Sequence, residues 1–104
     1  MLEVAHMGLH VAQMTGVDGM RACFDAVTKN PARILGLEGY GIEVGCYADC
    51  VVLDARDPIE AIRLRAARTA VVRRGKVASR SPAMRATLTL EGRPTEIDFR
   101  IDRR

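Results

Sequence analysis

The first fourteen residues carry one narrow polar stripe on an otherwise apolar pattern. The stripe repeats at spacings of three, four and three residues and consists of Glu3, His6, His10 and Gln13. A helix that is apolar on its other sides normally contacts protein on more than one of them. The pattern predicts a helix over residues 2 to 14, whose stripe faces water or a neighbouring helix.

A second helix is expected after the break at Thr15-Gly16, from about Asp18 to Thr28. Four apolar residues share one face of it: Met20, Cys23, Phe24 and Val27. This face predicts contact with the rest of the core.

A short third helix has signals at both ends. Asn30 followed by Pro31 is typical of an N-cap and a first helical residue, where the missing amide hydrogen of proline is harmless. Gly36 is typical of the left-handed residue that closes a helix. We therefore expect helices as far as residue 37.

From residue 38 onward the pattern indicates turns and short strands. Residues 50 to 53 are wholly apolar, and Asp57-Pro58 begins a helical turn that runs to Arg65. Residues 69 to 73 and 76 to 79 flank Arg74-Gly75, which predicts a hairpin.

Residues 87 to 90 and 97 to 101 alternate between apolar and polar, and a Gly-Arg-Pro turn lies between them. This predicts a last pair of strands. The fold class is thus α+β: two to three N-terminal helices over residues 1–37, then a small, mainly antiparallel sheet over residues 38–104.

Composition limits the class of protein. The chain has 104 residues, of which 48% are hydrophobic and 28% charged, which fits one soluble globular domain and no membrane span. No secretory signal is visible at the start. An odd number of cysteines without such a signal favours reduced thiols in the cytoplasm.

The charge is unevenly distributed. Residues 1–55 carry three basic and seven acidic groups, whereas residues 56–104 carry thirteen and six. A basic stretch over residues 63–85 contains no carboxylate and holds Arg63, Arg65, Arg68, Arg73, Arg74, Lys76, Arg80 and Arg85. Such a stretch is the argument for a different function, an interaction module for nucleic acid or an acidic partner. No aromatic residue lies inside it to stack on bases, so we disfavour nucleic acid.

Two pairs of residues have the chemistry of metal ligands. His6 and His10 are one helical turn apart, but no third ligand lies nearby in sequence, so a polar surface stripe is the favoured interpretation. Cys46 and Cys50 have a spacing that fits neither a zinc knuckle nor a redox motif, and we interpret them as core or turn residues.

Four segments together resemble the C-terminal end of the metal-dependent amidohydrolases: TKNPARILGL (28–37), GIEVG (41–45), ADCVVLD (48–54) and VVRRGKV (71–77). A fifth segment, MLEVAHMGLHV (1–11) at the start of the sequence, is similar to the helix after the eighth barrel strand in the cytosine deaminase branch. Each motif residue also has a local explanation; for example, Asp49 is expected to bond the backbone of its own turn. None is expected to be a catalyst.

The resemblance implies that residues 1–37 complete a (β/α)₈ barrel and that residues 38–104 form the C-terminal part of a β-sandwich beside it. It also implies a parent enzyme that deaminates cytosine or a related ring by hydrolysis, using iron or zinc to activate water. In the family the metal ligands belong to barrel strands that precede this sequence. We therefore expect no catalytic, metal or cofactor residue in this chain, and no activity from it alone.

The resemblance also implies a partner for this chain, namely the N-terminal barrel portion of the parent enzyme. Without it, the first helix would expose apolar side chains, each worth about 1.5 to 3 kcal/mol on burial. Exposing several of them would cost an amount similar to the stability of a small domain. We therefore expect self-association, most simply a twofold dimer burying more than about 1,000 Å², and expect Leu9→Glu to disrupt it or unfold the chain.

Overall fold

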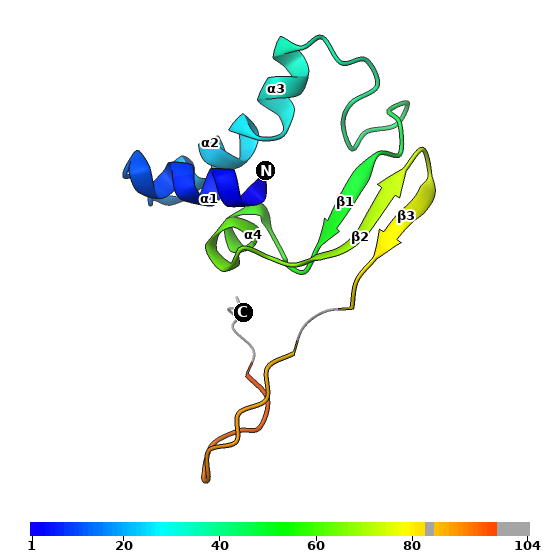
Figure 1. Cartoon of the computed structure of the whole chain (residues 1–104). Helices are drawn as coiled ribbons and strands as arrows, with labels where there is room; N and C mark the ends of the chain where they lie inside the picture. Colours follow the sequence, from blue (N-terminus) through cyan, green and yellow to red (C-terminus); the bar gives the residue numbers. More distant parts are fainter. Residues whose placement is uncertain (83–84, 98–104) are drawn as a thin grey trace.

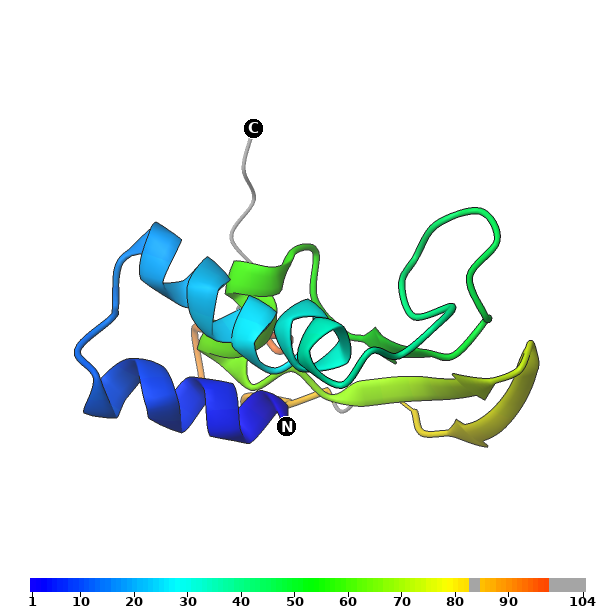
Figure 2. The same ribbon diagram turned by 90° about the horizontal axis from the view of Figure 1, so that it is seen from above.

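A computed structural model describes residues 1–82 and 85–97. Within them, four helices accompany a three-stranded antiparallel sheet of order β1-β2-β3, which confirms the α+β prediction. The helices α1, α2 and α4 form one cluster and the sheet extends away from it (Figures 1 and 2). None of these helices has the length and apolar character that crossing a membrane requires.

Helix α1 spans Leu2–Val11, so it ends three residues before the predicted boundary. Gln13 takes a left-handed conformation (φ 54°), and its amide and that of Met14 donate to the carbonyls of His10 and Leu9. This arrangement caps the helix and reverses the chain. The reversal brings Met14 so close to Gly19 that a Cβ there would lie 2.4 Å from the Met14 carbonyl oxygen.

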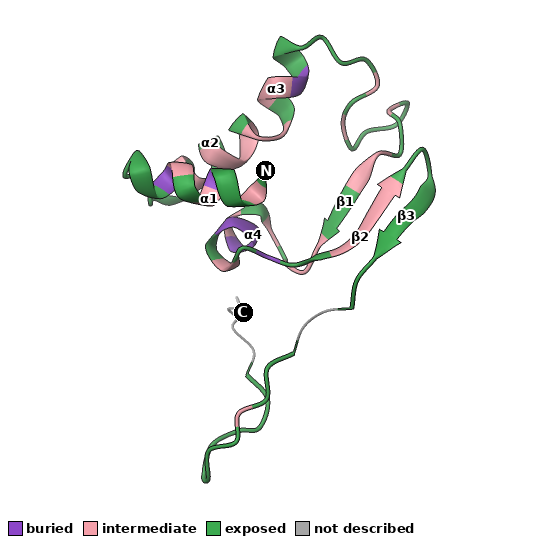
Figure 3. Cartoon of the chain, viewed as in Figure 1, coloured by how far each residue is buried: buried purple, intermediate pink, exposed green. Residues whose placement is uncertain are grey.

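Helix α2 spans Val17–Ala26, close to its predicted range. As expected, its apolar face packs on the core: Met20, Cys23, Phe24 and Val27 surround the buried cluster of Ala5, Leu9 and Ile62. Figure 3 shows buried residues on both α1 and α4. The core is small, because Ile62 is its one completely buried large side chain among the described residues.

Helix α3 spans Lys29–Ile34 with Thr28 at its N-cap, so the prediction of Asn30 at that position was wrong. The Thr28 hydroxyl donates instead to the Phe24 carbonyl at 2.7 Å and joins α3 to the end of α2. The C-terminal end of α3 agrees with the prediction. Gly36 has a φ of 61°, and the amide of Leu37 donates to the Ala32 carbonyl at 2.9 Å.

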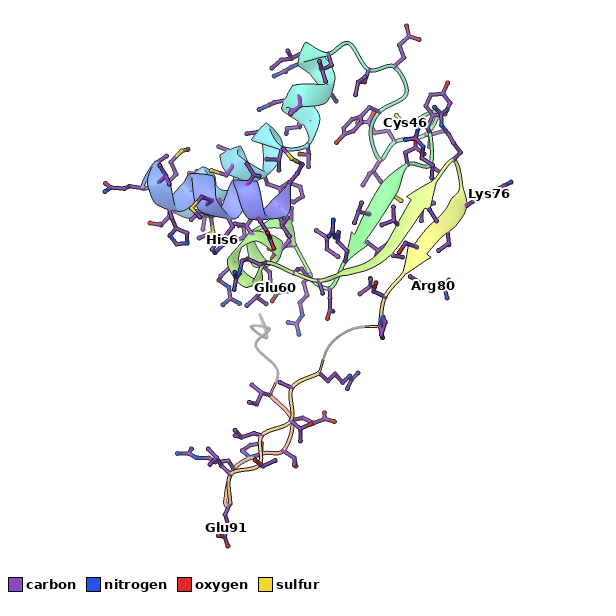
Figure 4. All side chains as sticks on the ribbon, viewed as in Figure 1. His6, Cys46, Glu60, Lys76, Arg80 and Glu91 are labelled. Carbon is purple, nitrogen blue, oxygen red and sulfur yellow. The ribbon has the colours of Figure 1, made fainter. Side chains whose placement is uncertain are left out.

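Strand β1 (Cys50–Leu53) and helix α4 (Pro58–Leu64) form where expected. The Asp57 carboxylate accepts the amide of Glu60, and the Glu60 carboxylate accepts the amide of Arg56, both at 2.8 Å. This reciprocal cap satisfies Glu60, which is buried beside the core (Figure 4). It fixes α4 where it contacts both α1 and α2.

Strands β2 (Arg68–Arg73) and β3 (Lys76–Arg80) form the predicted hairpin, and β1 pairs with the other edge of β2. Both outer strands therefore end the sheet. Val51 and Val52 of β1 remain 49% and 48% exposed, so apolar side chains of this outer strand are open to solvent.

The predicted final pair of strands was wrong in its first half. Residues 87–90 form no strand; instead Thr87 and Glu96 make an isolated bridge, and the Leu88 amide donates to the Thr95 carbonyl at 2.9 Å. Within residues 85–97 no further strand pairs with this hairpin, so it lacks the support that extended pairing needs. Phe99 and Ile101, in the second half, lie outside the described residues.

Candidate functional site

Two of the segments that resemble the family, residues 48–54 and 71–77, meet at the tip of the β2–β3 hairpin. The Asp49 carboxylate accepts the backbone amide of Arg74 at 2.5 Å and lies 3.4 Å from the guanidinium nitrogens of both Arg73 and Arg74. Beside it, the Gly75 amide donates to the Ala48 carbonyl at 3.0 Å. Asp49 thus bonds a residue 25 positions away rather than its own turn, which corrects the local interpretation.

Tyr47 completes this set of contacts. The Arg74 guanidinium lies 3.8 Å from the centre of the Tyr47 ring, within the range of a cation–π contact. The Tyr47 amide donates to the Gly39 carbonyl at 2.8 Å, and its ring covers Gly39 so closely that a Cβ there would approach it to 2.6 Å. No local sequence pattern predicts this contact, although the antiparallel pairing of β1 with β2 places residue 49 near the hairpin tip.

We name Tyr47, Asp49, Arg73 and Arg74 the hairpin clasp. Its one carboxylate accepts a backbone amide and faces two guanidinium groups, so its geometry is that of a structural tie. The backbone φ of Arg74 is 50°, a left-handed conformation that residues other than glycine rarely adopt. The contacts of Arg74 with Tyr47 and Asp49 offset that strain.

An open depression of about 350 Å³ lies beside α3 and is lined by Lys29, Ala32, Arg33, Gly36, Leu37 and Tyr40. Both of its cations have local partners. The Lys29 amine lies 2.9 Å from the Asp25 carboxylate, and the Arg33 guanidinium donates to the Asn30 side chain at 3.3 Å. The depression presents no nucleophile paired with a base.

The candidate metal ligands remain two separate pairs. The His6 and His10 rings lie edge to face with their centres 4.7 Å apart on α1, where His6 is half-buried and His10 is exposed. Cys46 lies in the loop before β1 and Cys50 begins that strand; both are half-buried free thiols. In residues 1–82 and 85–97, no three histidine, cysteine or acidic side chains gather where one ion could be held.

The basic stretch does not form one uniform surface. Arg73 and Arg74 face Asp49, and Arg85 lies 4.0 Å from the Glu96 carboxylate. Lys76 and Arg80 lie on β3, at the outer edge of the sheet (Figure 4). Tyr47, which lies outside the stretch in sequence, contacts Arg74 of the stretch in space.

Comparison with known proteins agrees with the geometry of these segments. A model of the amidohydrolase family matches residues 1–81. The chain belongs to this family. Among curated proteins, it is 46% identical over 52 residues to N-isopropylammelide isopropyl amidohydrolase of Pseudomonas sp. (strain ADP), a match of 49% of this chain and 13% of that protein.

Solved structures of 5-methylcytosine deaminase from Klebsiella pneumoniae also resemble this amidohydrolase chain. The complexes with phosphonocytosine and 5-fluorocytosine superpose with TM-scores of 0.73 and 0.74, both at 37% identity. Each match covers 80% of this chain and 20% of the deaminase. The chain therefore spans about one fifth of the length of these relatives.

Amidohydrolases generally depend on a metal, so the described residues can be tested for a fit to one. Within one copy they bring together no set of three ligands, and the family segments that do meet form the hairpin clasp. Residues 1–82 and 85–97 thus do not by themselves fit a complete catalytic metal centre.

Proposed function

We propose that this chain is the C-terminal segment of a cytosine deaminase-like amidohydrolase, whose complete form hydrolyses the exocyclic C–N bond of cytosine or a related ring. The observation that carries the proposal is the match of four-fifths of the chain, at 37% identity, to one fifth of a deaminase that binds cytosine analogues. The family match over residues 1–81 is independent support.

In this proposal the two halves of the chain have different structural roles. Residues 1–37 complete the catalytic barrel, and residues 38–104 form part of the β-sandwich. The catalytic iron or zinc and its ligands belong to the preceding part of the enzyme. The chain alone has no deaminase activity. Its odd number of cysteines supports a place in the cytoplasm.

The test compares two proteins made from the same reading frame. One is the 104-residue chain, and the other includes the codons 5′ to Met1. Ammonia release from cytosine and 5-methylcytosine is measured with iron or zinc supplied. We expect turnover from the longer protein only. Turnover by the purified 104-residue chain, or none by a longer, folded and metal-loaded protein, contradicts the proposal.

We also propose that the isolated chain self-associates through the solvent-facing side of α1. Three apolar residues there are largely exposed: Val4 at 58%, Met7 at 63% and Val11 at 77%. Leu9, in contrast, is buried within the chain's own core, so Leu9→Glu tests folding and not association. Val11→Glu is the sharper test. Sedimentation should show that this variant is a folded monomer, whereas the unsubstituted 104-residue chain forms dimers.

The second candidate is an interaction module that uses the basic stretch for nucleic acid or an acidic partner. The Tyr47–Arg74 stack is the observation in its favour, because it puts an aromatic ring beside cationic groups. Arg73 and Arg74 are already paired with Asp49, which argues against this candidate. Tight binding to random DNA with a steep salt dependence would favour this candidate over the amidohydrolase segment.

A further inference from the structure

The two faces of the sheet carry different residues. Directly opposite residues of an antiparallel pair lie on one face, and the faces alternate along each strand. The register places Cys50 opposite Val72, Val72 opposite Val77, and Val52 opposite Ala70. We call the face that these five residues share the apolar face.

The other face, which we call the mixed face, carries charge. Its residues are Val51, Val71, Arg73, Lys76 and Ser79, from the pairs of Val71 with Val51 and Ser79 and of Arg73 with Lys76. Covering this face would take the cations away from water, which costs free energy. An antiparallel sheet commonly packs one face on other protein and leaves the second in water. The residues therefore assign the apolar face to packing and the mixed face to solvent.

The described part of the chain does not supply this packing. Helices α1 to α4 pack on one another, and the strands pack on one another. Both views show the sheet extending away from the helices (Figures 1 and 2). On the apolar face Val52 and Val77 are 48% and 52% exposed. Arg80, opposite Ala70, lies at the end of β3, where its long side chain can reach water.

The size of the apolar face indicates what kind of partner can cover it. Three strands about 4.8 Å apart, with about five residues at 3.3 Å each, make a face of about 240 Å². A stable interface between separate chains buries about 800 Å² on each partner. A second copy of this chain would therefore need contacts well beyond this face.

A segment of the same polypeptide does not need so large a contact, because its tether keeps it at a high effective concentration. The solved relatives leave room for such a segment, since four-fifths of each deaminase lies outside the match with this chain. The covering layer must itself be apolar to match the valines.

We propose that the apolar face is the docking surface for an apolar sheet from the preceding part of the same enzyme, and that the mixed face remains in water. This inference rests on the proposed function and adds to it which face of the sheet forms the inner side of the sandwich. Two sheets packed in this way lie about 10 Å apart, with their inner side chains in contact.

The test uses single cysteine substitutions as probes of exposure. Val51 and Val52 are a matched pair, because they are neighbours in β1, are 49% and 48% exposed, and lie on opposite faces. Val77 and Ser79 repeat the comparison on β3. The variants Val51→Cys, Val52→Cys, Val77→Cys and Ser79→Cys are each made in the 104-residue chain and in the longer protein that includes the codons 5′ to Met1.

The rate of alkylation by iodoacetamide is measured on the folded proteins. Tandem mass spectrometry locates the label and separates it from Cys23, Cys46 and Cys50. Val52→Cys and Val77→Cys should react at least about tenfold more slowly in the longer protein than in the 104-residue chain, because a covered thiol reacts only when the structure opens. Val51→Cys and Ser79→Cys should react at similar rates in both proteins. Circular dichroism checks that each variant is folded.

Three results would overturn the inference. The first is equal reactivity of the two faces in the longer protein, and the second is protection of the mixed face in place of the apolar face. The third is protection of Val52→Cys in the 104-residue chain that increases with chain concentration, which would assign the face to a second copy.

The labelling does not depend on deaminase activity, so the two proposals can fail separately. A longer protein that protects Val52→Cys but releases no ammonia from cytosine contradicts the proposed function alone. A longer protein that deaminates cytosine but leaves Val52→Cys and Val77→Cys fully reactive contradicts the docking surface alone.

Discussion

The hairpin clasp should contribute measurably to stability, and Asp49→Ala is the substitution that tests it. The carboxylate is about three-quarters buried and accepts the Arg74 amide, which ties the loop before β1 to the hairpin tip. Removing it leaves that amide without its acceptor and leaves two guanidinium groups without their counter-charge.

The structure sets the magnitude. A hydrogen bond to a charged group contributes about 1.5–3 kcal/mol. The two ion pairs add little, because the arginine side chains are 70% and 54% exposed and exposed pairs are worth about 0–1 kcal/mol. We therefore expect a loss of about 1.5–2.5 kcal/mol. Asp49→Asn, which keeps an acceptor and loses the charge, should lose about half of that.

Urea unfolding at one fixed chain concentration measures the effect, since association makes stability depend on concentration. With a slope of about 2 kcal/mol per molar urea, the midpoint should fall by about 1 M. Glu96→Ala is the matched control, because its pair with Arg85 is 4.0 Å long and more than 80% exposed on both sides. It should change stability by less than about 0.5 kcal/mol.

Hydrogen exchange adds a local measurement. The Arg74 amide should exchange faster in Asp49→Ala than in the control, because its acceptor is gone. If Asp49→Ala matched Glu96→Ala in both unfolding midpoint and Arg74 exchange, the clasp would not stabilise the chain.

Three further predictions concern stability and are checked by the same unfolding measurement. Ile62→Ala should cost about 2–5 kcal/mol, because Ile62 is completely buried at the centre of the core; a loss below about 1 kcal/mol contradicts that role. Gly39→Ala should cost more than Gly45→Ala, since both have positive φ but only Gly39 lies against a ring, that of Tyr47; equal losses would exclude the steric contribution. Asp57→Ala should cost about 1 kcal/mol through loss of the α4 cap, and an unchanged midpoint would show the cap to be dispensable.

Elements whose signals are local could be predicted from the sequence alone. Asp57-Pro58 starts α4, Gly36 ends α3, and the Arg74-Gly75 pair turns the hairpin, all as predicted. In each case a side-chain cap or a left-handed glycine acts on the backbone within a few residues, so the information lies in one short window. The amidohydrolase relationship could also be recognised from the sequence, because each family segment is short and contiguous.

Features that depend on distant partners could not be predicted in this way. Periodicity showed α1 to be apolar on most sides, but only the positions of α2 and α4 selected Ala5 and Leu9 for burial and left Met7 and Val11 exposed. The end of α1 depended on the close approach of Met14 to Gly19.

The partners of Asp49 were also beyond the reach of local patterns. A carboxylate before a strand can bond its own turn or any amide that the fold brings to it, and both choices look alike in sequence. The pairing of β1 with β2 selected the Arg74 amide, 25 residues away. Local rules thus fixed where elements begin and turn, whereas packing between elements fixed which side chains are buried and which contacts hold the clasp together.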